Sequence, residues 1–251
     1  WKENLNGSFS GRMREFSDMI HSLGMKFGLW FEIERATEKA ESPRLRGNLY
    51  IKYGGQYFVD FTKPEAREYI LNLLNDRIKR YRIDFIKFDF NADFFDDPYG
   101  DAFISYYRGY EKFIKELRSA HPDIYIENCA SGGMRMQLAN GFLFDSFWLS
   151  DNQSALDGMR IFKDTMLRMP PQWIEKWATI RSLPGFSPVY GGDKKDKLLT
   201  TCDGVWENVA SLAYSWIDGF LSAGPLGISC DLTKLTDEVL DRLAKHISEY
   251  K

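Results

Sequence analysis

Cysteine and histidine are scarce in this chain of 251 residues, which has three of each. The cysteines are odd in number and none stand in CxxC spacing, which argues against a disulfide framework and a zinc knuckle. The histidines lie far apart, without an HxH or HExxH motif, which argues against a histidine metal site and a Ser-His-Asp triad. Carboxylates and aromatic side chains are abundant and remain as the groups that carry chemistry. We therefore expect no metal and no cofactor. The scarce residues are Cys129, Cys202, Cys230, His21, His121 and His246.

Long apolar runs and a large excess of one charge are also missing. No stretch approaches the roughly 20 apolar residues that a membrane span needs, so no membrane partner is expected. No signal peptide is expected from the residues before the first predicted helix. The net charge is −3, whereas nucleic-acid binders usually carry a basic patch, so no nucleic acid is expected. A hydrophobic content of 44% and a charged content of 27% are typical of a globular protein.

Short apolar runs alternate with amphipathic stretches, which predicts parallel strands joined by helical crossovers. A proline start signal, Pro64 after Thr62, marks one helix. Because about 250 residues is the usual size of a (β/α)₈ barrel, we predict one α/β barrel domain over residues 1–251. Fewer than eight strands are found, so either one late strand escapes detection or the chain lacks its first strand. The expected strands are 25–32, 57–62, 84–90, 124–129, 142–150 and, less clearly, 186–190 and 225–230. The expected helices are 11–23, 64–82, 102–120, 154–168, 204–217 and 233–250.

The strand 84–90 carries charged residues on one face. Successive strand residues alternate between faces, so Lys87, Asp89 and Asn91 share the face opposite Ile86 and Phe88. In a barrel that face points inward, and Asp89 lies at the carboxyl-terminal rim, where barrel enzymes place catalytic groups. A lysine close by would lower the pKa of Asp89 and keep it ionised, as a carboxylate nucleophile requires. A simple buried ion pair is the alternative, but it stabilises little after desolvation.

Other predicted strands also end in polar or aromatic residues. Trp30 points inward from 25–32 and Cys129 from 124–129, while Trp148 lies near the end of 142–150. A single tryptophan is best explained as core packing, but two beside rim carboxylates are typical of a sugar platform. Gly132 and its neighbour permit close approach of the backbone to a ligand, or simply a tight turn.

Asp151 follows the strand 142–150 and offers a second carboxylate. By itself it is best explained as a helix N-cap, for which Asp is a favoured residue. Together with Asp89 it can also be interpreted as a catalytic residue, since glycoside hydrolases use two carboxylates in different surroundings. The pattern alone leaves the two readings of Asp151 open.

Five segments together resemble the catalytic barrel of glycoside hydrolase family 36, the bacterial-type α-galactosidases. They keep the family's order and spacing over almost the whole chain. The segments are HSLGMKFGLWFEIE (21–34), IDFIKFDFN (83–91), ENCASGG (127–133), FWLSDNQ (147–153) and CDLTKL (230–235). The resemblance implies a retaining, exo-acting, metal-free α-galactosidase that forms a covalent galactosyl-enzyme. It also implies an oligosaccharide or glycoconjugate substrate and, with the unpaired cysteines, a bacterial cytoplasmic setting; a homo-oligomer is left open.

The resemblance assigns roles to individual residues. Asp89 matches the family's nucleophile and Asp151 its general acid/base. The remaining matches bind substrate: Lys87 contacts sugar hydroxyls, Trp30 and Trp148 surround the sugar pocket, Cys129 and Gly132 lie near the 2-hydroxyl, and Asn91 stands beside the nucleophile.

Some positions depart from the family pattern. Ile33 replaces a proline, and Gly54 stands where the family has an arginine that helps to hold the sugar. The family's first strand, with an Asp pair for the galactose 4- and 6-hydroxyls, and its flanking β-sandwich domains have no counterpart here. Three alternatives follow: an α-N-acetylgalactosaminidase or galactosaminidase, a transglycosylase similar to raffinose synthase, and a carbohydrate-binding barrel without catalysis.

Overall fold

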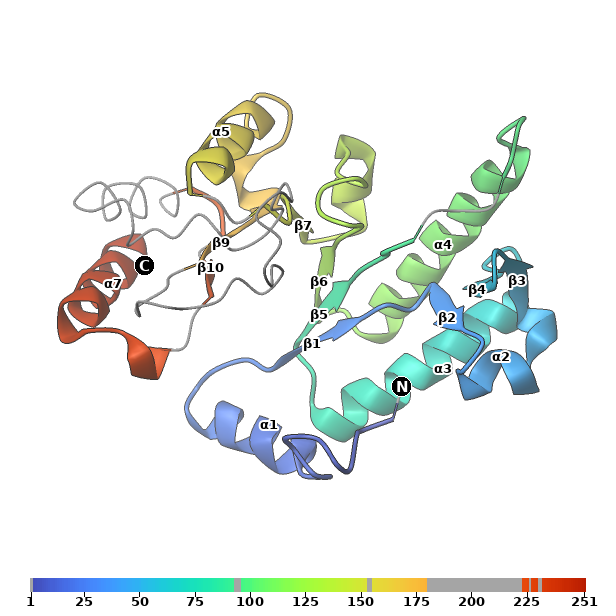
Figure 1. Cartoon of the computed structure of the whole chain (residues 1–251), viewed down its shortest axis with the longest axis horizontal. Coiled ribbons are helices and arrows are strands. Elements are labelled where there is room, and N and C mark those ends of the chain that lie inside the picture. Colours follow the sequence, from blue (N-terminus) through green and yellow to red (C-terminus); the bar gives the residue numbers. More distant parts are fainter. Residues whose placement is uncertain (1, 93–95, 153–154, 180–222, 226, 230–231) are drawn as a thin grey trace, which may run out of the picture. The chain divides into compact units, whose positions relative to one another are not determined.

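The chain divides into two compact units in a computed structural model (Figure 1). Unit 1 comprises residues 1–130 and 142–145, and unit 2 comprises residues 131–141 and 146–251. The structure describes residues 2–92, 96–152, 155–179, 223–225, 227–229 and 232–251. The predicted strand at 186–190 and the predicted helix at 204–217 lie outside these residues.

A parallel sheet of β1, β5 and β6 lies at the centre of unit 1. Its register pairs Trp30 with Lys87 and Lys87 with Glu127, so side chains from three strands meet on one face. Parallel strands and intervening helices confirm the α/β prediction. The elements of unit 1 are α1 (Met13–Ser22), β1 (Gly28–Phe31), β2 (Arg35–Thr37), α2 (Glu41–Leu45), η1 (Gly47–Leu49), β3 (Tyr50–Tyr53), β4 (Gln56–Val59), α3 (Pro64–Tyr81), β5 (Phe85–Phe88), α4 (Asp101–Ala120) and β6 (Tyr125–Asn128).

The helices α3 and α4 pack side by side (Figure 1). Proline occupies the start of α3 as predicted, but the Thr62 hydroxyl donates to Asp60 and does not cap the helix. The apolar stripe of α4 packs on Phe61, whose ring meets those of Tyr110 and Phe113 at 5.3 and 5.1 Å. Helix α4 approaches the Phe61 backbone at a glycine, Gly109, where an added Cβ would lie 2.2 Å from the Phe61 carbonyl oxygen.

The predicted strand 57–62 is not a barrel strand, and this part of the prediction is wrong. Residues Gln56–Val59 form β4, which pairs antiparallel with β2 and β3 in a separate three-stranded sheet. Gly54 and Gly55 join β3 to β4 with φ of +55° and +74°, as a two-residue hairpin with right-handed twist requires. The position where the family has an arginine is therefore a hairpin turn.

Unit 2 contains short strands, two α-helices and short 3-10 segments among its described residues. Strands β7 and β8 pair in parallel, as do β9 and β10. The last pair confirms the predicted strand near 225–230, and α7 confirms the helix 233–250. The bounds are η2 (Leu138–Phe142, ending in unit 1), β7 (Ser146–Trp148), α5 (Ala155–Thr165), η3 (Pro171–Trp173), β8 (Ile174–Glu175), β9 (Trp177–Thr179), β10 (Gly227–Ser229), η5 (Leu232–Lys234) and α7 (Asp237–Tyr250).

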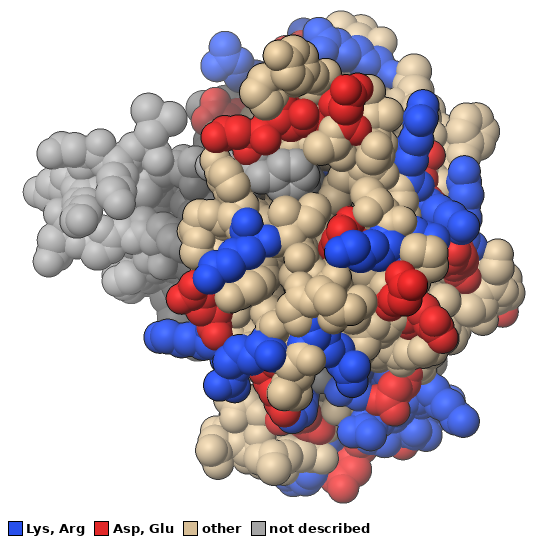
Figure 2. Space-filling model, turned by 90° about the vertical axis from the view of Figure 1, so that its right-hand side faces the viewer, with Lys and Arg blue, Asp and Glu red and all other residues tan. Residues whose placement is uncertain are grey.

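Lysine and arginine side chains are interspersed with acidic ones on the face shown in Figure 2. In the part of the chain that the structure describes, no helix is both long enough and apolar enough to cross a bilayer.

Candidate active site

Asp89 follows β5 directly and is buried, with 8% of the residue exposed. Burying an ionised carboxylate is costly unless hydrogen bonds replace its water. Three donors do so. The Trp30 indole Nε1 donates to Oδ2 at 3.1 Å, the Asn91 side-chain Nδ2 to the same oxygen at 2.9 Å, and the Phe90 backbone N–H to Oδ1 at 2.7 Å. Asp89 is thus held in one orientation from two strands.

The pKa of Asp89 is lowered. Burial by itself would raise the pKa, but hydrogen bonds from Asn91, Trp30, Cys129 and the Phe90 backbone outweigh it. Each of these donors favours the charged form. The carboxylate is therefore ionised at neutral pH, as predicted. The largest lowering effects come from these hydrogen-bond donors and not from the lysine that the sequence analysis named.

Lys87 forms its ion pair with Glu127, its register partner on β6. Glu127 is 1% exposed, and burial raises the pKa of its carboxyl group against the lowering effect of Lys87. The charge of Asp89 raises that pKa further. Three charged groups therefore meet on the inner face of the sheet. Strand alternation puts Glu127 on the same face as Cys129, but the alternation within one strand does not show which residue of the next strand lies opposite.

A second layer supports Asn91. Its backbone N–H donates to Glu32 Oε1 at 2.9 Å, and Glu32 Oε2 accepts from the Arg35 guanidinium at 3.1 Å. Glu32 directly follows β1, so this bridge fixes the segment after β5 to the segment after β1. The sequence analysis did not find Arg35, because its partner depends on the path of the chain after β1.

Cys129 follows β6, is buried, and carries a free thiol. Its backbone N–H donates to the Phe88 carbonyl at 2.8 Å, and its side chain adds a hydrogen bond to Asp89. The structure therefore brings Trp30, Asn91 and Cys129 into contact with the Asp89 carboxylate.

Asp151 lies in unit 2 together with two of the predicted substrate-binding residues, Trp148 and Gly132. The Trp148 indole Nε1 donates to Asp151 Oδ1 at 2.8 Å. Gly132 has φ +89°, and a Cβ there would lie 3.3 Å from the Asp151 backbone nitrogen. This glycine is therefore needed for its own conformation and for the approach of the chain to Asp151.

Trp148 is 4% exposed, so its indole packs in the interior. Its ring lies 4.5 Å from that of Trp177, and Trp177 lies against Gly227, where an added Cβ would be 2.0 Å from the Trp177 ring. The sequence analysis missed Trp177. No motif contains it, and its contact with Trp148 depends on tertiary packing.

Among the described residues, no three or more His, Cys, Asp and Glu side chains are grouped so that they could hold a metal ion.

A family model described as Melibiase matches residues 1–181. The chain belongs to the melibiase family. The curated α-galactosidase Mel36A of Lactobacillus acidophilus is 27% identical over 259 residues, which cover 97% of this chain and 32% of that protein. The chain therefore spans about a third of this relative's length. The resemblance to family 36 α-galactosidases stated from the sequence is confirmed.

Solved structures of family 36 α-galactosidases share the fold of this melibiase chain. The structure of AgaB from Geobacillus stearothermophilus has a TM-score of 0.79 at 20% identity, covering 100% of this chain and 34% of that one. A variant of AgaA from the same organism, solved with stachyose, has a TM-score of 0.76 at 20% identity, covering 95% and 32%. This likeness confirms the predicted α/β barrel class.

Proposed function

We propose that this chain carries the catalytic carboxylates of a retaining, exo-acting α-galactosidase. The observation that carries the proposal is Asp89, a buried carboxylate kept ionised by hydrogen bonds at the end of a parallel strand. Membership of the melibiase family and the similarity to Mel36A support the substrate class. Asp89 would act as nucleophile and Asp151 as general acid/base.

In the first step one oxygen of Asp89 attacks the anomeric carbon of the α-galactoside. The bond from that carbon to the glycosidic oxygen breaks, and its electron pair goes to the leaving oxygen, which takes a proton from Asp151. The product is a galactosyl ester of Asp89 with inverted configuration. Holding Asp89 by fixed donors reduces the reorganisation needed at the moment of attack.

In the second step Asp151, now ionised, takes a proton from water. The water oxygen attacks the anomeric carbon and displaces Asp89, which regains its negative charge. Two inversions restore the α configuration. The Trp148 indole, hydrogen-bonded to Asp151, would hold the acid/base in place through both steps.

The predicted binding residues have different exposures, and this separates their roles. Trp30 is 51% exposed while its indole N–H holds Asp89, so its ring is available as a sugar platform. Trp148 is buried, which favours positioning of Asp151 over stacking on sugar. Lys87 would offer its ammonium to sugar hydroxyls from beside Glu127, and Cys129, Gly132 and Asn91 would shape the pocket.

An oligosaccharide with a terminal α-galactosyl group is the expected substrate, in line with the AgaA variant solved with stachyose. An α-N-acetylgalactosaminide is the second candidate, favoured by the hairpin glycine Gly54 in place of the family's arginine. Turnover of nitrophenyl α-galactoside and nitrophenyl α-N-acetylgalactosaminide by the full protein separates the two candidates.

Asp89→Ala and Asp151→Ala test the proposal. We expect Asp89→Ala to lose at least about 10⁴-fold in kcat on nitrophenyl α-galactoside, since both chemical steps need this carboxylate. Circular dichroism should show an unchanged fold. Asn72→Ala, an exposed substitution on α3, is the control and should keep full activity. Substantial activity in Asp89→Ala, or sugar binding without turnover by the unaltered protein, would contradict the proposal.

A further inference from the structure

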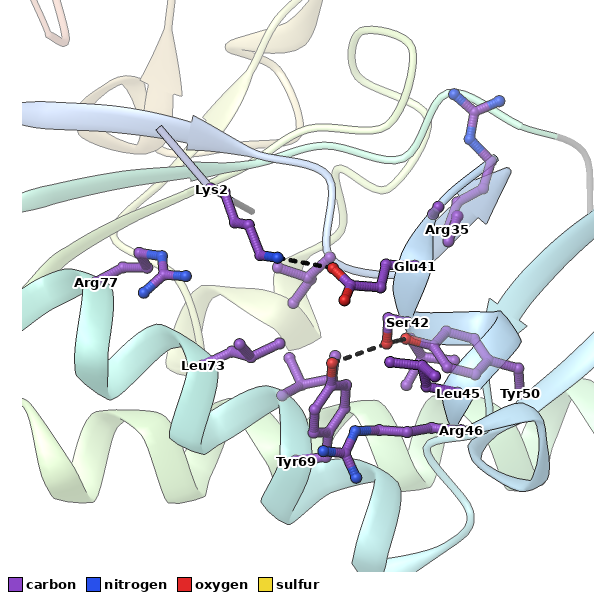
Figure 3. A pocket seen from close by; sticks show the side chains of 15 residues that line it. Lys2, Arg35, Glu41, Ser42, Leu45, Arg46, Tyr50, Tyr69, Leu73 and Arg77 are labelled. Atoms are coloured by element: carbon purple, nitrogen blue, oxygen red, sulfur yellow. Dashed lines mark hydrogen bonds and ion pairs between the residues drawn. The ribbon is translucent and has the colours of Figure 1, made fainter. Parts of the chain in front are cut away.

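Unit 1 contains a cavity that none of the proposed catalytic or sugar-binding residues lines (Figure 3). Its volume of about 580 Å³ is in the range of small-molecule sites. It lies between the segment after β1, α2 and α3. Its apolar floor is formed by Ile33, Val59, Ile70 and Leu73. Such a floor suits the apolar or ring-shaped body of a small ligand.

Three hydroxyl groups meet in this cavity. Ser42 Oγ lies 2.6 Å from the Tyr50 hydroxyl and 2.8 Å from the Tyr69 hydroxyl (Figure 3). Burial raises the pKa of Tyr50, so its hydroxyl keeps its proton. Three hydroxyls have three protons, and their two mutual hydrogen bonds use two of them. One donor is therefore left over for a ligand.

Cations outnumber acids around the same space. Lys2, Arg35, Arg46 and Arg77 line the cavity, and Glu41 is the single acidic residue among the lining side chains. Lys2 binds Glu41 at 2.7 Å, while Arg35 and Arg77 pair with Glu32 and Asp76.

Arg46 differs from the other three cations. Its guanidinium lies 4.8 Å from the centre of the Tyr69 ring, and no ion pair is found for it among the described residues. A guanidinium stacked on an aromatic ring keeps its N–H donors directed outward and ready for a planar anion.

We propose that this cavity binds a small organic anion, with a phosphoryl or carboxyl group on an apolar or ring-shaped body. The charged group would bind Arg46 and the spare hydroxyl proton of the Ser42–Tyr50–Tyr69 cluster. The body would pack on the apolar floor. A donor-rich wall favours an acceptor-only group, and the net positive lining favours a negative charge.

Calorimetric titration of the full protein at low salt tests this proposal with three probes of one shape. Phenyl phosphate carries the phosphoryl group, benzoate the carboxyl group, and benzyl alcohol is neutral. We expect at least one anion to bind saturably and to weaken as NaCl is added, while benzyl alcohol binds at least tenfold more weakly. Whichever anion binds more tightly identifies the charged group. Because no probe is a galactoside, failure here leaves the proposed α-galactosidase activity untouched.

Two substitutions assign the binding to this cavity. Arg46→Gln should weaken anion binding about tenfold, the effect of one charge-assisted hydrogen bond. Arg44→Gln, on the short helix α2 that Arg46 directly follows but outside the cavity lining, is the matched control and should change binding less than twofold. Tyr69→Phe keeps the ring under Arg46 and should weaken binding severalfold. The proposal is overturned if neither anion binds, if benzyl alcohol binds equally well, or if Arg46→Gln and Arg44→Gln behave alike.

Discussion

At the scale of single residues, Asp89 shows how neutral hydrogen-bond donors help to keep a buried carboxylate charged. Its donors are an indole, a side-chain amide, a thiol and a backbone N–H. Neutral donors stabilise the negative charge, and a carboxylate oxygen keeps a lone pair with which it can attack carbon. A tight ion pair with a cation would make that lone pair less nucleophilic. The adjacent Lys87 is occupied by Glu127.

Removing one donor should move the acidic limb of the activity profile. The pKa of Asp89 is below its ordinary value, and the carboxylate must be ionised to attack. Asn91→Ala removes a hydrogen-bond donor to the charged form of Asp89, so the pKa of Asp89 rises. As the pH is lowered, the variant therefore loses activity at a higher pH than the unaltered protein does. We expect the acidic limb of kcat/KM to move up by at most about one pH unit. The pH profile of kcat/KM on nitrophenyl α-galactoside measures this shift. If the acidic limb of Asn91→Ala lies at the same pH as that of the unaltered protein, the result argues against Asp89 as the nucleophile.

Lys176 is a buried residue without a role in the proposed chemistry. It is 2% exposed, and its ammonium lies 4.1 Å from the Phe162 ring centre and donates to the Ala223 carbonyl. Burial lowers its pKa to about 8, well below the value near 10.4 of an exposed lysine. Below pH 8 the lysine is charged in both states, and the folded state bears the full cost of burying that charge.

Stability should therefore rise as the pH increases above 8. Between pH 8 and about 10.4 the unfolded chain binds more protons at this residue than the folded chain, so its contribution to the free energy of unfolding grows with pH. Relative to Lys176→Met, the unaltered protein should gain about 2 kcal/mol between pH 7 and pH 9.5. Urea unfolding measures this. Lys163→Met, an exposed position on α5, should not change the pH dependence. If the free energy of unfolding depends on pH in the same way in Lys176→Met and in the unaltered protein, burial does not lower the pKa of Lys176.

At the scale of elements, the approach of α4 to the chain at Phe61 depends on one glycine. Alanine is normally the better helix former by about 1 kcal/mol. At Gly109 a Cβ would meet the Phe61 carbonyl at 2.2 Å, so Gly109→Ala should destabilise by about 1–3 kcal/mol instead. Ser105→Ala, exposed on the same helix, should change the free energy of unfolding by less than about 0.5 kcal/mol. A Gly109→Ala variant as stable as the parent in urea would refute the close packing.

The contact of β9 with Trp148 should matter for acid catalysis. Trp177 packs on Trp148, and Trp148 holds Asp151. General acid assistance matters most when the leaving group is poor. Trp177→Ala should therefore lower kcat/KM on raffinose at least about fivefold more than on nitrophenyl α-galactoside, and Trp177→Phe should recover most of the loss. An equal loss on both substrates would mean that Trp177 acts on the fold as a whole.

The sequence predicted most elements because alternation and helical period follow directly from burial. It placed Asp89 and Trp30 correctly, since period two fixes the face of a strand. It assigned the segment 57–62 to the wrong sheet, because strand alternation looks the same in parallel and antiparallel sheets. The paired glycines Gly54 and Gly55 are the sequence feature that indicates a hairpin, and so an antiparallel sheet, at this point. The partners of Lys87 and Trp148 depend on cross-strand register and tertiary packing, which local patterns do not encode.

At the scale of the whole molecule, the chain spans about a third of Mel36A. The prediction of a single domain over residues 1–251 stays a prediction, and Asp89 and Asp151 belong to different compact units. The double displacement needs both carboxylates to act on one substrate. The central claim is therefore that the two carboxylates have different roles, with Asp89 as nucleophile and Asp151 as general acid/base.

The configuration of the products formed with azide tests this claim most directly. In Asp89→Ala, azide takes the place of the missing nucleophile and should give β-galactosyl azide from nitrophenyl α-galactoside. In Asp151→Ala the galactosyl ester still forms, and azide, which needs no base, should attack it to give α-galactosyl azide. NMR of the two products distinguishes them. Opposite configurations are predicted; the same configuration from both variants, or azide-independent turnover by Asp89→Ala, would contradict the account.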